Sequence, residues 1–410
     1  MKTKLLILTM LAGILFASCQ SDKKHVLQIE NPLEIQRKDA DIKLSRNQIE
    51  NHLGEIDGSQ VPAPFLNNEV LPCQFDDLDM DGQWDEMVFL IDLEAQATES
   101  VQLKLVDENA LPEFKTRTNL RLAAILEKEE KEYKELEEAK RIEEWEVKAS
   151  KFQFEGPGWE NDKVGFRNYF DWRSGMDIFG KNTDKMILDS AGINVSYHDM
   201  AWWGMDILKV AESLGAGALA IYYNDSLYRV TASDADYQAI VEGPVRSMFE
   251  LGYYNMKVGD EIAEVNHQIS ITAGKFFYSS HISVKGLQKE SKVVSGIVNM
   301  HDLKLNDLSS AKSALRYTYG KQSLNEDKLG MAILAEKNEV IEWFETPAKG
   351  QDITETYAVK MKNSTNDSTD FRFYAAWEMT DDRFKTEADF AEFMKKQQMR
   401  FENPVRIAFK

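Results

Sequence analysis

Short apolar or alternating runs fill the chain from residue 25 to about residue 115. The runs HVLQIENPL, EMVFLIDL and SVQLKLVDE are separated by stretches rich in Asn, Pro, Gly and Asp. Alternation with a period of two is typical of half-buried strands, and the separating residues are typical of turns. Residues 25–115 are therefore predicted to form a small antiparallel β domain.

The pattern changes in residues 126–145, LEKEEKEYKELEEAKRIEEW. Glu and Lys dominate this stretch, Pro and Gly are absent, and Glu precedes Lys at helical spacing. We expect a solvated helix within a charged connector over residues 116–150. A helix that binds a partner is the alternative.

From residue 151 to residue 410, short strand-like runs alternate with turn residues. Examples are GPVRSMFELGYYNM, KFFYSSHISVKG and DFRFYAAWEM. This spacing favours one large antiparallel β sandwich over alternating β-α units. The stretch TEADFAEFMKKQQMRF, residues 386–401, has the pattern of an amphipathic helix. The predicted class is therefore mainly β.

The first residues have the pattern of an export signal. Two lysines precede an apolar stretch over residues 5–16, and Ala17 and Ser18 then lead into Cys19. A membrane-spanning helix needs about 20 apolar residues, so this stretch favours a signal peptide. The pattern resembles a bacterial lipobox, which predicts that residues 1–24 are signal peptide and tether, with a lipid on Cys19. The expected location is the periplasm or the outer membrane, with the lipid anchor as the only contact with the membrane.

The charge balance limits the classes of ligand that the chain is expected to bind. The chain has 69 acidic and 49 basic residues, a formal net charge of −20. Nucleic-acid binding requires clustered cations, so this balance argues against it, and an acidic substrate must be held by a few local cations.

The cysteine content excludes an internal disulfide, because only Cys73 remains if Cys19 is lipidated. No charged neighbour of Cys73 is evident, which predicts a small buried hydrophobe and not a nucleophile.

An acidic loop, DLDMDGQWDE, stands in the predicted N-terminal domain. It places Asp77, Asp79 and Asp81 at alternate positions, followed by a glycine and then Asp85. Carboxylates spaced in this way in a tight turn converge on Ca²⁺, although the loop lacks the Glu that completes an EF-hand. The alternative is a metal-free turn whose Asp side chains bind their own backbone. In both cases the role is structural, and no cofactor is expected for catalysis.

The densest chemistry lies in residues 156–181 and 196–217. Tyr197 and His198 are adjacent there; His titrates near neutral pH, and a Tyr beside cations can act through a lowered pKa. Clustered titratable groups beside aromatic faces favour a binding or catalytic site. The candidate substrate-binding residues are Trp159, Glu160, Asp171, Trp202, Trp203 and Asp206, together with Arg246 and His281 from distant strands.

Each of these residues also has a structural explanation when taken singly. Asp206 and Lys209 have the spacing of a helical ion pair. Asp171 and Arg173 suit a surface salt bridge, which contributes under about 1 kcal/mol. Tryptophan pairs commonly belong to a core. Only the concentration of such groups in two short segments favours a site.

Four stretches carry a family resemblance: GWENDKVGFRNYFDWRSGMDIFGK, SYHDMAWWGMDILKVAESLGAGALAIY, GPVRSMFELGYYNMKVGD and KLGMAILAE with FYAAWE. In this order they resemble a domain family of unknown function that occurs in polysaccharide-degradation gene clusters, often as lipoproteins. The resemblance extends to the acidic loop and covers nearly the whole mature chain. It implies a β supersandwich of the galactose-mutarotase kind.

One member of that family, from an ulvan-degradation system, is an oligosaccharide dehydratase. It removes water from a non-reducing-end uronic acid and leaves a 4,5-unsaturated sugar. Such a reaction requires a cation on the carboxylate, a base that works near neutral pH and an acid for the leaving oxygen. We expect His198 as base, Tyr197 as acid and Arg173 as carboxylate anchor, with Lys209 as the alternative anchor.

Several alternatives stay open at this stage. Either Asp206 or Asp199 is expected to orient the imidazole, and neighbouring residues on a strand face opposite sides, so the site need not recruit both Tyr and His. A glycoside hydrolase would need two carboxylates, from Glu160 with Asp171 or Asp206. A non-catalytic glycan-binding lipoprotein would use the Trp faces alone. The expected partner is an oligosaccharide in each case.

Overall fold

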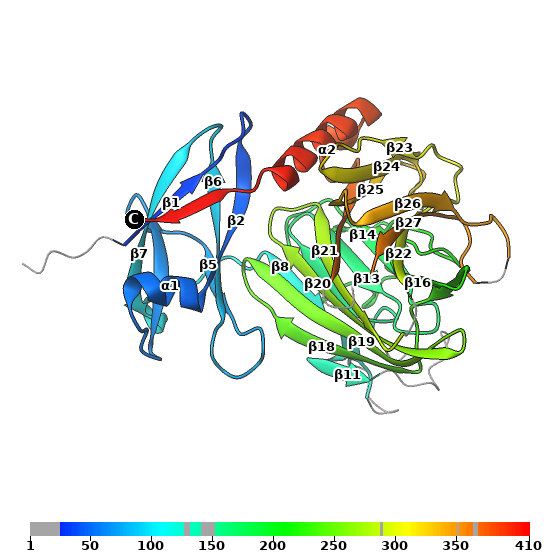
Figure 1. Ribbon diagram of the computed structural model, residues 1–410, viewed down its shortest axis with the longest axis horizontal. Helices are drawn as coiled ribbons and strands as arrows, with labels where there is room; N and C mark the ends of the chain where they lie inside the picture. The colour runs from blue at the N-terminus through cyan, green and yellow to red at the C-terminus, as the bar shows by residue number, and fades with distance from the viewer. Residues whose placement is uncertain (1–24, 127–131, 141–151, 288–289, 351, 364–367) are drawn as a thin grey trace, which may run out of the picture.

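The computed structural model describes residues 25–126, 132–140, 152–287, 290–350, 352–363 and 368–410. The chain forms a small lobe and a large lobe that lie side by side (Figure 1). Strands make up most of the regular structure in both lobes, and neighbouring strands pair antiparallel. The predicted mainly β class is therefore confirmed. The predicted signal peptide and Cys19 lie outside the described residues.

The small lobe is a sandwich of two sheets. Its strands are β1 (Val26–Glu30), β2 (Arg37–Ser45), β3 (Gln60–Leu66), β4 (Glu69–Val70), β5 (Cys73–Asp76), β6 (Glu86–Leu93), β7 (Thr98–Asp107) and β29 (Arg406–Phe409). One sheet has the order β29-β1-β7-β3-β4 and the other β2-β6-β5. Leu27, Phe89 and Val101 are buried in their shared core. Helix α1 (Arg46–Leu53) follows β2, and a capping box of Ser45 and Gln48 satisfies its first backbone N–H groups. A short 3₁₀ helix, η1 (Glu108–Ala110), follows β7.

The last strand of the chain belongs to the small lobe. In β29, Ile407 pairs with Ile29 of β1, and Phe409 pairs with Leu27. The sequence predicts a single large domain over residues 151–410, but the final residues of that range cross back to the N-terminal sheet. The exposed edge of β1 is what receives them, and that long-range pairing leaves no local pattern in the sequence.

The large lobe contains one nine-stranded sheet and two five-stranded sheets. The nine-stranded sheet runs in the order β11 (Glu138–Lys140), β18 (Asp234–Val241), β19 (Arg246–Val258), β20 (Glu261–Thr272), β21 (Phe277–Lys285), β28 (Thr369–Trp377), β25 (Lys328–Glu336), β24 (Ser313–Lys321) and β23 (Asn306–Asp307). The second sheet runs β15 (Gly204–Asp206), β14 (Met176–Lys181), β13 (Val164–Asn168), β12 (Gly158–Asn161) and β8 (Thr118–Arg121). The third runs β17 (Ser226–Arg229), β16 (Ala220–Tyr223), β22 (Lys292–Val298), β27 (Thr356–Lys362) and β26 (Val340–Glu345).

Aromatic rings join the nine-stranded sheet to the sheet that contains β12 and β13. The ring of Trp159 lies 5.1 Å from Phe249 and 5.3 Å from Tyr278, and Phe166 lies 6.4 Å from Phe373, measured between centroids. These residues belong to one buried apolar cluster. This layered packing of antiparallel sheets is the predicted supersandwich architecture.

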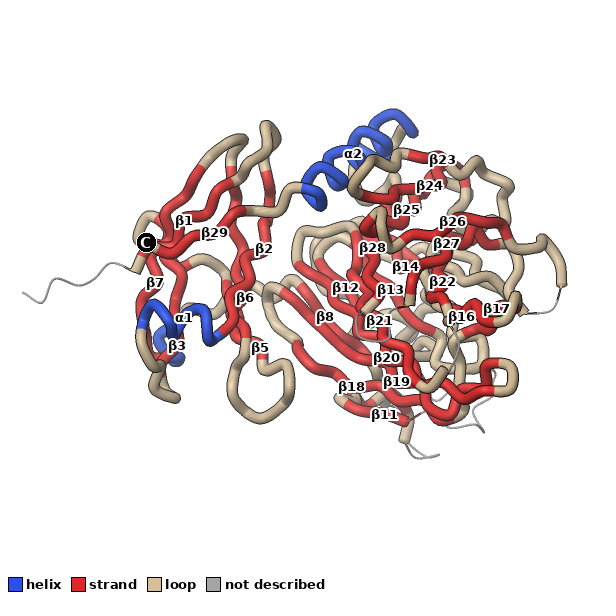
Figure 2. The backbone as a smooth tube through the Cα atoms, in the orientation of Figure 1, coloured by secondary structure: helices blue, strands red, loops and turns tan. Residues whose placement is uncertain are grey.

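Helix α2 (Glu387–Glu402) lies on the outer side of the nine-stranded sheet (Figure 2). Thr386 caps its N-terminus, and Phe390, Phe393 and Met394 are buried against the sheet. Gly330 of β25 allows the close approach, because a Cβ there would lie 2.6 Å from the Phe390 ring. The 3₁₀ helix η3 (Asp382–Phe384) precedes α2. The predicted amphipathic helix is thus confirmed, and no described helix is long and apolar enough to cross a membrane.

The charged connector is not helical where the structure describes it. Residues 134–135 form β10, which pairs with β9 (Ala123–Ala124), and β11 adds to the edge of the nine-stranded sheet, with Glu138 opposite Gln238. The predicted helix over residues 126–145 is therefore wrong for residues 132–140, whereas 127–131 and 141–145 lie outside the described residues. Pairing with a long neighbouring strand outweighs local helix propensity here, and charged side chains are common on edge strands because they discourage further pairing.

Cys73 is buried at the start of β5. Burial raises the pKa of its thiol to about 12, so the group stays protonated at neutral pH. The prediction of a small buried hydrophobe is confirmed.

Candidate functional site

Three neighbouring strands bring the two chemically dense segments together. In the antiparallel register, Arg167 of β13 lies opposite Asp177 of β14, and Asp206 of β15 lies opposite Phe179 of β14. Directly paired residues on antiparallel strands are close enough for their side chains to interact. The fold therefore places groups far apart in sequence around one point.

The Arg167 guanidinium is the centre of this cluster. It is buried, and its Nη2 donates to Oδ2 of Asp177 and to Oδ2 of Asp206, both at 2.8 Å. The Tyr169 hydroxyl donates to Asp177 at 2.7 Å. Burial, and then the nearby charge of Asp206, raises the pKa of Asp177 to about 7. One guanidinium thus holds two buried carboxylates, a charge-assisted arrangement.

The His198 imidazole lies at the solvent side of this cluster. Its Nδ1 is 3.2 Å from Oδ2 of Asp206, and its side chain is 55% exposed while that of Asp206 is 1% exposed. The hydrogen bond to Asp206 raises the pKa of His198 above its usual value. Of the two predicted orienting residues, Asp206 makes this contact, whereas Asp199 is exposed. Because Nδ1 is held, Nε2 is the ring nitrogen left for other partners.

The Tyr197 ring lies between His198 and Arg167. Its centroid is 4.4 Å from that of His198, and the Arg167 Cζ lies 4.7 Å from it. Tyr197 and His198 occupy a turn and not a strand, so both side chains reach the same side. Burial raises the pKa of Tyr197, and the opposing effect of Arg167 is smaller. The expected lowered pKa is therefore wrong, and the phenol keeps its proton at neutral pH.

Arg173 joins the cluster through Glu155. The Arg173 Nη2 lies 2.6 Å from Oδ2 of Asp171 and 3.3 Å from Oε1 of Glu155. The other oxygen of Glu155 lies 3.6 Å from the Arg167 Nη1. The Arg173 guanidinium also stacks over Tyr169, 4.1 Å from the ring centroid. Two carboxylates already hold Arg173, and its Nη1 is the nitrogen without a hydrogen bond to any described residue.

The sequence places Arg167, Tyr169 and Asp177 in the chemically dense segment 156–181 as a cation, an aromatic face and an acid, without a specific catalytic or substrate-binding role for any of them. Glu155 was missed altogether. For Arg167 the sequence holds an indication, because an arginine inside the short strand VGFRN, whose residues are all buried, must find carboxylate partners. Glu155 gave no such indication. It has a positive φ of 72°, a backbone conformation that its sequence neighbours do not predict.

Three predicted substrate-binding residues are structural. Trp159 is fully buried in the core between the sheets, and Trp203 packs against Phe179. Glu160 is fully buried, pairs with Lys181 and accepts hydrogen bonds from two backbone N–H groups at 2.6 and 2.8 Å. The prediction that these three residues contact a sugar is wrong, because apolar packing and internal hydrogen bonds already use their surfaces.

Trp202 is the exposed member of the Trp pair. The residue is 62% exposed, and the Lys185 Nζ lies 5.8 Å from the ring centroid. Lys209 is also exposed and forms no ion pair or hydrogen bond with a described residue. The suggested Asp206–Lys209 pair does not form, since Asp206 contacts Arg167 and His198.

Arg246 and His281 lie apart from the cluster. Arg246 is buried at the junction of the lobes, where it pairs with Asp76 and lies 2.8 Å from Glu86. His281 lies on β21, with Nδ1 2.9 Å from Asp370 on the neighbouring β28. The prediction that Arg246 and His281 line the substrate site is therefore wrong, because their strands belong to parts of the large sheet that lie away from the cluster.

The acidic loop gathers three of its four predicted ligands. Oxygens of Asp77, Asp79 and Asp85 lie within 4.8 Å of one another, whereas Asp81 accepts a hydrogen bond from the Gln83 N–H at 2.8 Å. This set of carboxylates fits a hard cation such as Ca²⁺. The same side chains also accept hydrogen bonds from backbone N–H groups of the loop, as a metal-free turn requires. Calcium binding stays a prediction.

Comparison with known proteins gives a relative and two structural neighbours. The chain is 22% identical to "Uncharacterized protein P7" of Formosa agariphila over 438 residues, which cover all of both chains. An α-mannosidase from Enterococcus faecalis V583 is similar with a TM-score of 0.48 and 8% identity over 95% of this chain. A second E. faecalis protein, of glycosyl hydrolase family 38, is similar with a TM-score of 0.42 and 8% identity over 95% of this chain. This chain spans 46% and 48% of those two solved chains.

A family model matches almost the whole described chain. The match covers residues 29–407 and so includes both lobes and the cluster around Arg167. The resemblance predicted from the motifs is confirmed: the chain belongs to the family described as "Domain of unknown function (DUF4861)".

Proposed function

We propose that the protein is a carbohydrate-active lyase that eliminates water from a terminal uronic acid of an oligosaccharide. The observation that carries the proposal is His198, an exposed imidazole that is oriented by the buried carboxylate of Asp206. A general base requires a group that titrates near neutral pH, is held in one orientation and reaches the substrate. His198 is the member of the cluster with all three properties.

The step balances without a cofactor. The Nε2 of neutral His198 takes the proton from C5 of the uronate, and the C–H electron pair forms the C4–C5 double bond. The C4–O bond breaks, and the leaving hydroxide takes a proton and departs as water. Tyr197 is suited to give that proton, because burial raises the pKa of its phenol and keeps it protonated.

A cation near the uronate carboxylate would stabilise the charge that develops in the transition state. Arg173 is the cluster guanidinium with partial exposure, and its Nη1 is not engaged by a described residue. Asp171 and Glu155 fix the position of the Arg173 guanidinium, which suits the orientation of a substrate group. Their negative charges also offset the positive charge that Arg173 presents to a substrate. Lys209 is the exposed alternative on the same segment as His198.

Hydrolysis by paired carboxylates is less well supported. That mechanism requires two carboxylates on either side of the scissile bond. Glu160 is fully buried and saturated by Lys181 and backbone N–H groups, and Asp206 is buried against Arg167. Neither is positioned to act directly on a glycosidic oxygen.

The test is incubation of the purified protein with oligosaccharides that end in a uronic acid. Elimination creates a conjugated double bond, which is measured as an increase in ultraviolet absorbance. We expect His198→Ala to lower this rate at least about a hundredfold, the scale of general acid–base catalysis. His281→Ala is the matched control, because His281 has the same 55% exposure and also bonds a carboxylate, but lies outside the cluster.

Each other result points to a different function. Release of reducing ends without absorbance would indicate a hydrolase. Glycan binding without either product would indicate a binding protein. Equal rates for wild type and His198→Ala, with circular dichroism showing both folded, would contradict the proposed base.

We also propose that the protein is lipid-anchored at Cys19, in the periplasm or on the outer membrane. The Ala-Ser-Cys sequence after an apolar stretch supports this. Metabolic labelling with a palmitate analogue should mark the wild type but not Cys19→Ala. Equal labelling of both would rule out this anchor.

A further inference from the structure

A cationic pocket lies where the two lobes meet the C-terminal end of α2. Its volume is about 170 Å³, enough for a small ion or one sugar unit, and it lies outside the His198 cluster. Strand β2, the strands β21 and β28 and helix α2 all contribute to its wall. The charged residues that line it are Arg37, Lys38, Asp41, Lys275, Arg372 and Arg400. In a chain of net charge −20, five cations beside one carboxylate are a local reversal of sign.

Arg372 is the group in this pocket best placed to bind an anion. Its guanidinium lies between two phenyl rings, 4.7 Å from the Phe277 centroid and 5.0 Å from the Phe401 centroid. It forms no ion pair with a carboxylate among the residues described. Stacking fixes the plane of the guanidinium and leaves its N–H groups at the edge, which is the geometry that recognises oxyanions.

Two further guanidiniums also lack a carboxylate in the described chain. Arg37 donates to Asn31 and to backbone carbonyls, and Arg400 donates to the backbone of Gln36 at 2.8 Å, while its Nε has no partner. Burial lowers the pKa of Arg37 to about 10, and the charge of Arg400 adds to this effect. The single acid of the pocket, Asp41, lies 3.2 Å from Lys275. Lys38 pairs with Asp92 at 3.0 Å. Among the described residues, Arg37, Arg372 and Arg400 are therefore the pocket cations that form no ion pair with a carboxylate.

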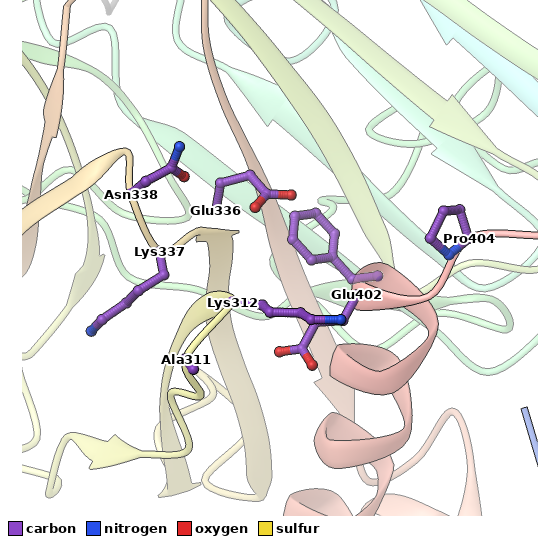
Figure 3. A pocket seen from close by; sticks show the side chains of 8 residues that line it. Ala311, Lys312, Glu336, Lys337, Asn338, Glu402 and Pro404 are labelled. Atoms are coloured by element: carbon purple, nitrogen blue, oxygen red, sulfur yellow. The ribbon is translucent and has the colours of Figure 1, made fainter.

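A neighbouring cavity provides a contrast. It has a volume of about 540 Å³ and is also lined by Pro404 at the end of α2 (Figure 3). Its charges are balanced, because Glu336 and Glu402 accompany Lys312 and Lys337 (Figure 3). The excess of cations is thus a property of the smaller pocket and not of the whole helix end.

We propose that the smaller pocket is a binding site for an oxyanion: sulfate, phosphate or a sugar carboxylate. The anion would accept hydrogen bonds from Arg372 and neutralise the charge shared with Arg37 and Arg400. Because the walls come from both lobes and from α2, the bound anion would hold these three parts together. The site is separate from the proposed elimination site and does not depend on it.

Isothermal titration calorimetry of the purified protein with sodium sulfate tests the proposal, with ionic strength held constant by sodium chloride. Parallel titrations with phosphate, glucuronate and a monosaccharide sulfate ester distinguish an inorganic ion from a glycan substituent. We expect at least one of these to bind with a stoichiometry near one, and Arg372→Gln to weaken it at least tenfold. Arg400→Gln serves as a second variant, in case the first does not fold.

Arg383→Gln is the matched control. Arg383 also stacks on phenyl rings, 5.5 Å from the Phe393 centroid, but it pairs with Asp381 and does not line the pocket. The affinity of Arg383→Gln for the anion should equal that of the wild type. The proposal is overturned if none of the four anions binds, or if Arg383→Gln weakens binding as much as Arg372→Gln. Elimination activity should be unchanged in Arg372→Gln, which separates this result from the test of His198.

Discussion

At the residue scale, one carboxylate connects the buried and the exposed parts of the candidate site. The same Oδ2 of Asp206 contacts the Arg167 guanidinium at 2.8 Å and the His198 imidazole at 3.2 Å. Arg167 compensates the cost of burying this charge, which would otherwise be several kcal/mol. Asp206 therefore stays available to stabilise a protonated imidazole. The pKa of the exposed His198 imidazole is therefore raised by a carboxylate, Asp206, that is itself ion-paired with the buried Arg167.

The pH dependence of activity should reveal this coupling. Asp206→Asn removes the interaction that raises the pKa of His198, so the pKa falls. If His198 acts as a neutral base, activity is lost as pH falls through its pKa, and the variant should retain activity to lower pH. We expect the acidic limb of kcat/KM to move to lower pH. Asp199→Asn should leave the limb in place, and an unmoved limb in folded Asp206→Asn would contradict the coupling.

Gly204, at the start of β15, should tolerate no side chain. Its φ is +127°, and a Cβ there would lie 1.9 Å from the Gly180 carbonyl oxygen. We expect Gly204→Ala to lower the free energy of unfolding by at least about 3 kcal/mol, measured by chemical denaturation. Gly54→Ala is the control, because Gly54 has a φ of +89° but no atom within 4 Å of the added Cβ. Equal losses, of about 1 kcal/mol, would show that only the backbone conformation matters.

Residue types alone predict part of the cluster. The sequence placed Tyr197, His198 and Asp206 together because they lie in one short segment, and local chain geometry keeps them close. It could not separate Trp202 from Trp203, since one position decides which indole faces solvent and which faces Phe179. Glu160 was predicted to contact the substrate because burial cannot be read from one residue in a strand.

At the element scale, strand pairing explains why the helix predicted in the charged connector is wrong. Glu and Lys at helical spacing favour a helix by only a few tenths of a kcal/mol per pair. β11 instead aligns residues 138–140 with β18, at the edge of the nine-stranded sheet. By contrast, α2 was predictable because its apolar face and Thr386 cap are both local features. The strands of both lobes were predictable for the same reason, although their order in the sheets was not.

The acidic loop gives a prediction at this scale. If Asp77, Asp79 and Asp85 bind Ca²⁺, an excess of 100 times the Kd should stabilise the fold by about 2.7 kcal/mol. Thermal unfolding should then show a higher Tm in calcium than in EDTA, and Asp79→Asn should remove the difference. Asp57→Asn, an exposed acid outside the loop, should keep it. The same Tm in both buffers would favour the metal-free turn.

At the scale of the whole molecule, buried polar groups join the two lobes. Arg246 of the large sheet pairs with Asp76 of β5, and both side chains are nearly fully buried. The Gln74 side chain accepts hydrogen bonds from the backbone of Val245 and Arg246, each at 2.8 Å. A hydrogen-bonded buried pair fixes relative orientation more strictly than apolar contact does. The lobes should therefore move as one body.

Breaking that pair should be costly. Arg246→Met leaves the Asp76 carboxylate buried without its cation, and we expect a loss of about 3–5 kcal/mol in the free energy of unfolding. Adding Asp76→Asn should recover part of the loss. Arg406→Met, which breaks the exposed pair with Glu30, should cost under about 1 kcal/mol by the same denaturation measurement. A loss that small in Arg246→Met would mean that the junction is held mainly by other contacts.

The pairing of β29 with β1 has a consequence for biogenesis. The ribosome makes β1 first, yet its neighbour in the sheet is completed only when residues 406–409 have been synthesised. Until then, β1 is an edge strand whose unpaired backbone N–H and C=O groups can pair with another extended chain. The N-terminal sheet is thus completed only after most of the chain has been synthesised, and chaperone protection of this open edge would matter throughout synthesis.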